Sequence, residues 1–132
     1  MKVIALDFGS ARTGVAVSDE TGTIARPVGV VEGAATPDGL AAVANLVRAE
    51  GAERVVVGLP LTMRGEQGEQ AAETERFVES LRAMLDVPVK SFDERFTTDL
   101  AERAPDAHAP ADARAAAHLL SSYLTWSISK SS

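Results

Sequence analysis

The sequence contains no cysteine among its 132 residues. Disulfide bonds, thiolate metal ligands and cysteine nucleophiles are therefore excluded. Long hydrophobic runs are also missing, since the chain begins MKVIALDFG and only Val3 to Leu6 form an apolar run before Asp7. This run is shorter than the ~7–15 apolar residues of a secretory signal, and no segment approaches the ~20 of a membrane span. We therefore expect a cytoplasmic protein that does not interact with membranes.

An excess of basic charge is also missing. The chain has 13 lysines and arginines against 19 acidic residues, so its formal net charge is −6. Nucleic-acid-binding surfaces are normally basic, and this charge argues mildly against such a partner. However, ten of the basic residues are arginines, the side chain suited to bidentate phosphate contact. Composition alone leaves the partner open. The length suits a single domain over residues 1–132.

Hydrophobic spacing predicts the order of the elements. Strands are expected at 3–6, 13–18, 24–31, 55–57 and 87–92. Helices are expected from Pro37 to a cap at Gly51, over 71–85, over 97–103 and over 111–126, with 127–132 frayed. Short turns between the first three strands favour an antiparallel meander, and two βα units follow. The pattern βββαβαβα predicts an α/β fold, a mixed five-stranded sheet with helices on both faces.

Three acidic residues stand where such a sheet binds its ligands. Asp7 ends the first strand, Glu94 follows the last strand, and Asp112 lies in the first turn of the last helix. Each has an ordinary alternative role: a turn residue, a solvated surface charge, or a carboxylate that complements the helix dipole. An acid beside the apolar stripe of the last helix needs a partner, either a metal ion or an arginine. Three oxygen ligands from these positions would suit Mg²⁺ or Mn²⁺.

Two polar segments could contact phosphate. Thr97 and Thr98 are candidate phosphate ligands, although one of them suits a helix cap better. The loop from Gly58 to Gly68 carries three glycines and Arg64, so it could approach a phosphate backbone or simply join a strand to a helix. It lacks the Gly-Lys-Ser/Thr ending of a P-loop, which makes a mononucleotide site of that type improbable.

Four segments, taken in order, resemble the YqgF family, also called RuvX. They are DFGSARTGVAV from Asp7, VGLPL from Val57 with Gly65, DERFTT from Asp93, and DARAAA from Asp112, followed by Tyr123-Leu124. Each segment is weak alone, but together they span nearly the whole chain. Members of this family are described as Holliday junction resolvase-like proteins and as pre-16S rRNA nucleases. The resemblance implies a ribonuclease H-like fold, which agrees with the element order above.

The resemblance also implies a site and a reaction. The family's acidic triad corresponds to Asp7, Glu94 and Asp112, which would hold two Mg²⁺ or Mn²⁺ ions for phosphodiester hydrolysis. The expected activity is endonucleolytic, in 5′-end processing of precursor 16S rRNA, in cleavage of branched DNA junctions, or in both. Candidates for substrate contact are the side chains of Arg12, Arg64, Arg95, Thr97 and Thr98.

The chain departs from the family pattern before Asp112. The interval from Glu94 is 112 − 94 = 18 residues, shorter than is usual in the family, and residues 104–111 contain no lysine or arginine. We therefore expect weak, salt-sensitive substrate binding. Two other functions stay open: a nucleotide-binding phosphotransferase of the actin-like type, and a non-catalytic nucleic-acid-binding assembly protein. A homodimer is also open.

Overall fold

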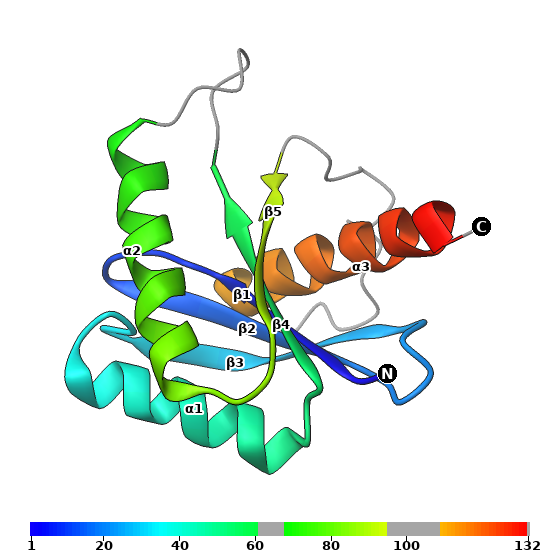
Figure 1. The fold of residues 1–132 in the computed structure, drawn as a ribbon, viewed down its shortest axis with the longest axis horizontal. Coiled ribbons are helices and arrows are strands. Elements are labelled where there is room, and N and C mark those ends of the chain that lie inside the picture. Colours follow the sequence, from blue (N-terminus) through cyan, green and yellow to red (C-terminus); the bar gives the residue numbers. More distant parts are fainter. Residues whose placement is uncertain (61–67, 95–108, 132) are drawn as a thin grey trace.

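A computed structural model describes residues 1–60, 68–94 and 109–131 (Figure 1). The strands are β1 (Val3–Asp7), β2 (Arg12–Ser18), β3 (Ala25–Glu32), β4 (Arg54–Leu59) and β5 (Val89–Asp93). The helices are α1 (Pro37–Glu50), α2 (Glu69–Met84) and α3 (Ala111–Ser131). The strands form one sheet in the order β3-β2-β1-β4-β5. The predicted element order and the mixed five-stranded sheet are confirmed, while the helix expected over 97–103 lies outside the described residues.

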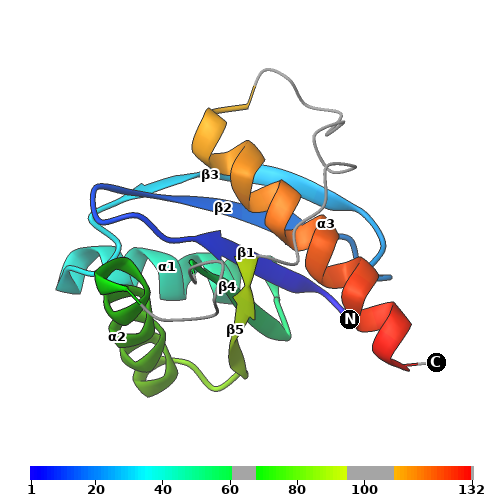
Figure 2. The ribbon, with the colours of Figure 1, turned by 90° about the horizontal axis from the view of Figure 1, so that it is seen from above.

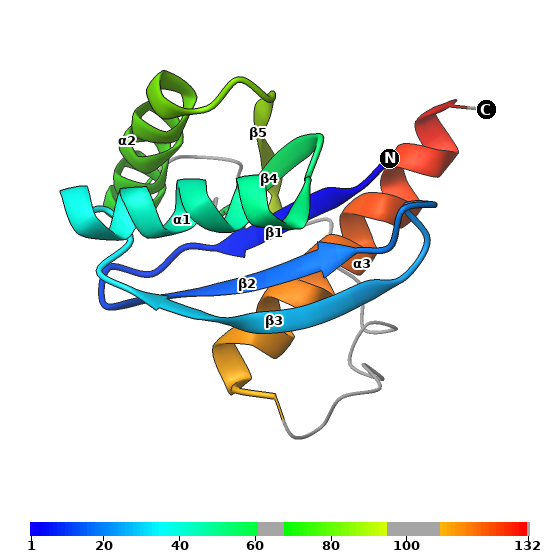
Figure 3. The ribbon, with the colours of Figure 1, turned by 90° about the horizontal axis from the view of Figure 1, so that it is seen from below.

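The helices cover both faces of the sheet, as predicted. Helices α1 and α2 lie on one side and α3 on the other (Figures 2 and 3). Alternate side chains of β1 enter the two layers, since Ile4 and Leu6 pack toward α1 and α2 while Val3 and Ala5 pack against α3. The strand run Val55 to Val57 is fully buried, because β4 is covered on both faces.

Helix boundaries follow from local chemistry. The Thr36 side chain accepts a hydrogen bond from the backbone N–H of Gly39 at the start of α1, and Pro37 occupies the first turn. Gly51 ends α1 with φ of 67°, which confirms its prediction as the C-cap. Helix α3 continues to Ser131, past the expected end at residue 126, because no glycine or proline follows Pro110 to stop it.

The directions of the strands determine which edge of the sheet can hold a ligand-binding site. Strand β1 pairs in parallel with β4, and β4 pairs in parallel with β5, so their carboxyl ends meet at one edge of the sheet. Ligands of α/β sheets bind outside this edge. None of the helices within the described ranges is both long and apolar enough to cross a membrane.

Candidate active site

Asp7 and Glu94 meet at the carboxyl edge of the sheet. Asp7 ends β1 and continues the alternation of Val3 and Ala5, so it shares the α3 face. Glu94 directly follows β5, whose residue Phe92 is also buried on that face. The two carboxyl side chains are joined by a hydrogen bond, which requires a proton between them. The fold thus brings together two residues 87 positions apart in sequence, since 94 − 7 = 87.

Burial disfavours the state in which Asp7 and Glu94 are both ionised. Burial, the charge of Asp7 and the hydrogen bond with Asp7 raise the pKa of Glu94 to about 7. Burial also raises the pKa of Asp7, and the charge of Asp112 adds to this effect. Two carboxylates in one partly buried site therefore hold a proton that isolated carboxyl groups would lose. A divalent cation would relieve the same repulsion.

Asp112 approaches from α3, the helix that covers this same face of the sheet. It lies in the first turn of α3, where a negative charge is favoured by the helix dipole. Its Oδ2 atom forms an ion pair with Nε of Arg12, at 3.3 Å. Arg12 begins β2, next to the strand that carries Asp7. The site therefore contains two neighbouring pairs: the hydrogen-bonded carboxyl groups of Asp7 and Glu94, and the ion pair of Asp112 with Arg12.

Two glycines make this arrangement sterically possible. Gly14 pairs with Asp7 across the β1–β2 ladder, and a Cβ atom there would lie 1.8 Å from the backbone oxygen of Asp112. Gly58 occupies the corresponding place on β4, where a Cβ would lie 2.7 Å from Oε1 of Glu94. The absence of a side chain at Gly14 thus admits the start of α3, and the absence at Gly58 admits the Glu94 side chain.

Sequence reasoning assigned no role to Gly14, and it placed Gly58 at the start of a loop that could approach a phosphate backbone, whereas the structure places Gly58 inside β4. An isolated glycine inside a strand pattern often marks a close backbone approach, and this signal was present at Gly14, within the strand predicted over 13–18. What approaches them could not be predicted, because Asp112 and Glu94 lie far away in sequence.

The chain after Asp7 is anchored on both sides. The Phe8 ring stacks on Phe77 of α2, with ring centroids 4.4 Å apart. The buried Thr13 hydroxyl lies 3.4 Å from both the backbone nitrogen and the carbonyl oxygen of Gly9. These contacts hold the turn between β1 and β2, and with it the position of the Asp7 carboxylate.

The outcomes for the predicted site residues differ. Asp7 and Glu94 are in direct contact, while Asp112 and Arg12 lie beside them as an ion pair. Within the described ranges, no three histidine, cysteine or acidic side chains already gather as a metal-binding group. The shared metal site stays a prediction. The other candidates, namely Arg64, Arg95, Thr97 and Thr98, lie outside the described residues.

Comparison with solved structures shows the class of fold. The chain superposes on Thermus thermophilus RuvC in complex with Holliday junction substrate with a TM-score of 0.69 and 17% identity, covering 98% of this chain and 96% of that one. The fowlpox virus Holliday junction resolvase gives a TM-score of 0.53 at 12% identity, with 99% of each chain covered. The fold is that of the ribonuclease H-like resolvases, as the sequence resemblance implied.

Comparison of sequences is more specific. The family model described as RuvX, Holliday junction resolvase, matches residues 1–126. A Chloroflexus aggregans protein named "Putative pre-16S rRNA nuclease" is 48% identical over 101 residues, or 76% of this chain and 71% of the relative. A Chloroflexus aurantiacus protein of the same name is 46% identical over 101 residues, which cover 76% of this chain and 66% of the relative. This chain belongs to the RuvX family.

Proposed function

We propose that this chain is a divalent-metal-dependent endonuclease that hydrolyses phosphodiester bonds, with Asp7, Glu94 and Asp112 as its catalytic residues. The observation that carries the proposal is the meeting of the Asp7 and Glu94 carboxyl groups at the carboxyl edge of the sheet, with Asp112 close enough to raise the pKa of Asp7. Family membership favours this function over the actin-like phosphotransferase that composition and motifs had left open.

The donor set fits hard divalent ions. All three candidate ligands are carboxylates, and oxygen donors of this kind suit Mg²⁺ or Mn²⁺. When bound, two such ions would supply Lewis-acid activation of water and neutralise charge on the leaving oxygen. Asp7, which interacts with both Glu94 and Asp112, would be the central ligand of the three. Gly14 and Gly58 keep the ligands in position through the spaces described above.

The substrate that we propose first is precursor 16S rRNA, because the relatives at 46–48% identity are named for that activity. Branched DNA is the second candidate, because the matching family is described as a Holliday junction resolvase. Arg12 lies on the same face as the carboxylates, and it would be released toward a phosphate when Asp112 binds metal. Substrate contacts by Arg64, Arg95, Thr97 and Thr98 stay predictions, as does the homodimer.

The decisive experiment compares cleavage by the parent and by Asp7→Asn. Both would be assayed with Mg²⁺ and with Mn²⁺ on a structured precursor RNA and on a four-way DNA junction. We expect Asp7→Asn to lose cleavage while its circular dichroism spectrum stays that of the parent, since the two side chains have nearly the same volume. Asp38→Asn is the matched control, because Asp38 is an exposed acid in the first turn of α1.

The outcomes separate the hypotheses. Metal-dependent cleavage that Asp38→Asn retains and Asp7→Asn loses supports the nuclease. Binding of both substrates without cleavage by the parent would favour the non-catalytic assembly protein. Full cleavage by a folded Asp7→Asn protein would contradict the assignment of the site.

A further inference from the structure

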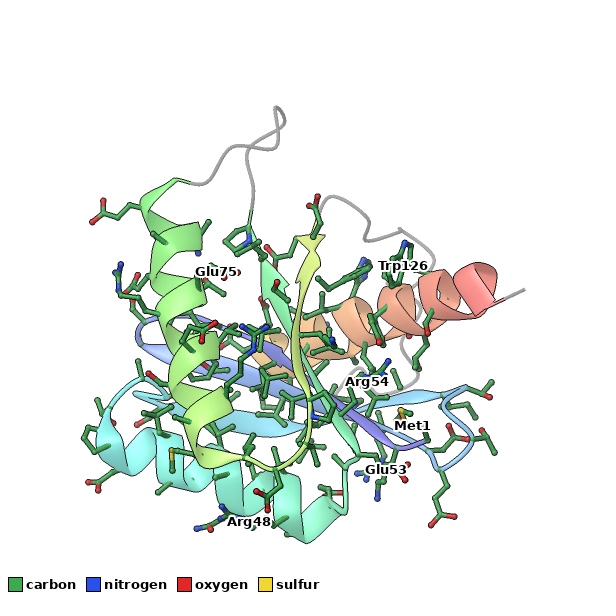
Figure 4. All side chains as sticks on the ribbon, in the orientation of Figure 1. Met1, Arg48, Glu53, Arg54, Glu75 and Trp126 are labelled. Atoms are coloured by element: carbon green, nitrogen blue, oxygen red, sulfur yellow. The ribbon has the colours of Figure 1, made fainter. Side chains whose placement is uncertain are left out.

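A cavity of about 350 Å³ lies at the edge of the sheet opposite to Asp7. It is bounded by the starts of β1 and β4, by the turn between β2 and β3, and by the second half of α3. Val3 lines the cavity and Asp7 ends the same strand, so the cavity and the candidate active site are roughly 13 Å apart at ~3.3 Å per residue. Figure 4 shows Arg54 and Met1 close together at this edge.

Arg54 places a positive charge beside this cavity without a carboxylate to balance it. Among the described arginines, Arg12, Arg26 and Arg82 each form an ion pair with an acidic side chain, and Arg54 is one of those that form none. The Nη1 atom of Arg54 donates a hydrogen bond to the Tyr123 hydroxyl at 2.8 Å. The Nε atom of Arg54 is buried and has no hydrogen-bond acceptor among the described residues. A guanidinium that is partly withdrawn from water in this way is stabilised by an anion.

Tyr123 supplies a second donor at the same place. Its hydroxyl oxygen accepts the hydrogen bond from Arg54, so its own hydrogen is directed elsewhere. None of the described side chains that line the cavity is acidic. Asp19, the acid of the neighbouring turn, accepts hydrogen bonds from the backbone N–H groups of Thr23 and Ile24 and borders a different depression. The Arg54–Tyr123 pair therefore presents two donors and one positive charge to an anion.

The rest of the cavity wall suits an apolar group attached to that anion. Val3 and Leu124 line it beside Arg54 and Tyr123. Its volume stands at the lower end of the range for small-molecule sites, roughly 300–1,000 Å³. This volume exceeds the needs of a free phosphate ion and matches a phosphate ester that carries a sugar and a base.

We propose that this cavity binds a phosphate ester of nucleotide size, with the phosphate on Arg54 and Tyr123 and the sugar or base against Val3 and Leu124. The ester can be a free mononucleotide or the 5′-phosphorylated end of an RNA, which present the same chemistry. The site is separate from Asp7, Glu94 and Asp112, and it does not depend on the proposed hydrolysis.

Isothermal titration calorimetry in EDTA tests the proposal, since metal-dependent binding at the carboxylates is then absent. The probes are AMP, adenosine, inorganic phosphate and the 5′-phosphorylated dinucleotide pApA. We expect AMP to bind more tightly than adenosine or phosphate. Arg54→Met should lower the affinity for AMP by about tenfold, the loss of a charge-assisted hydrogen bond. Fluorescence of Trp126, the single tryptophan of the chain, gives a second readout, because its ring centroid lies 6.0 Å from that of Tyr123.

Two controls make the result specific. Arg48→Met removes an arginine that donates to the backbone oxygen of Met84 outside the cavity, and Asp7→Asn alters only the candidate active site. Both should bind AMP as the parent does. If Arg54→Met does not fold, Tyr123→Phe takes its place, with an expected loss of about threefold.

The proposal is overturned if AMP and pApA give no binding signal. It is also overturned if folded Arg54→Met and Tyr123→Phe bind AMP as tightly as the parent, or if Asp7→Asn abolishes the binding. Tighter binding of pApA than of AMP would identify the end of an RNA as the source of the phosphate. The reverse order would identify a free nucleotide, and either order supports the site.

Discussion

Replacing Gly58 by alanine tests whether the space at this position holds Glu94 against Asp7. The added Cβ would lie 2.7 Å from Oε1 of Glu94, 3.0 Å from Cδ2 of Leu119 and 3.1 Å from Cγ of Glu94. These are side-chain atoms, so the clash can be relieved by rotating Glu94 away. That rotation breaks the hydrogen bond between Glu94 and Asp7. The backbone of β4 can stay where it is.

The expected cost to stability is small and the expected cost to activity is large. Overfilling a packed site costs about 1–3 kcal/mol, and alanine recovers about 0.4–1 kcal/mol by restricting the unfolded chain. A net loss of about 1–2 kcal/mol leaves a domain of ordinary stability, ~5–15 kcal/mol, folded. Displacement of a catalytic group by about 1 Å can reduce the rate about 100-fold. Gly58→Ala should therefore be a folded protein with roughly 1% of the parent's cleavage rate.

The assay combines cleavage kinetics with carboxyl-carbon NMR titration of Glu94. Gly29→Ala on β3 is the matched control, because a Cβ there meets nothing within 4 Å. In the parent the pKa of Glu94 should be about 7, and in Gly58→Ala it should fall as the side chain leaves the buried pair. A Gly58→Ala protein that keeps both the parent's rate and its Glu94 titration would refute this account of the glycine. The titration tests the role of Gly58 even if neither substrate is cleaved.

Three further predictions concern the same edge of the sheet. Folding raises the pKa of Glu94 from its ordinary value of 4.5 to about 7, so the stability that this group contributes is complete below pH ~4.5 and is lost as the pH rises through about 7. The metal-free parent should therefore melt at a lower temperature at pH 8 than at pH 6. Glu94→Gln should show a smaller difference between the two melting temperatures. Arg12→Ala frees Asp112 from an exposed ion pair worth ~0.2–1 kcal/mol, so Mn²⁺ affinity measured by electron paramagnetic resonance should rise about 1.4- to fivefold. In the same variant, the slope of log affinity against log salt for RNA in Ca²⁺ should flatten by about 0.7; an unchanged slope would remove Arg12 from the phosphate contacts. Gly14→Ala places a Cβ 1.8 Å from a backbone oxygen of α3, and no side-chain rotation relieves this clash. The melting temperature of Gly14→Ala should therefore fall much further below that of the parent than the melting temperature of Gly58→Ala does. Equal melting temperatures for the two variants would contradict the close approach of α3.

Local sequence signals predicted the layers of this fold. The apolar run before Asp7, the spacing after Pro37 and the glycine at position 51 each depend on near neighbours, and the structure agrees with all three. The predicted end of α3 at residue 126 is too early, because the prediction followed the apolar stripe, whereas the helix continues to Ser131 in the absence of any glycine or proline after Pro110.

The site was less predictable than the fold, because its parts interact across the sheet. The place of Glu94 after the last predicted strand made it a candidate but also fits a solvated surface acid, and its raised pKa depends on Asp7, 87 residues earlier. The partner of Asp112 was left open between a metal ion and an arginine, and the structure shows Arg12 there. The family resemblance identified the three acids together, whereas the contacts among them are known only from the three-dimensional structure.

The close packing of α3 on Gly14 also determines when the candidate site can form during synthesis of the protein. A ribosome delivers Asp7 early, Glu94 much later and Asp112 last, since domains emerge from their N-terminal end. Strands β1 to β5 precede α3 in the chain, so until that helix is made and docks on β2 the Asp7–Glu94 pair lacks its third acid. Docking of α3 is therefore the step that brings the third candidate ligand to the site.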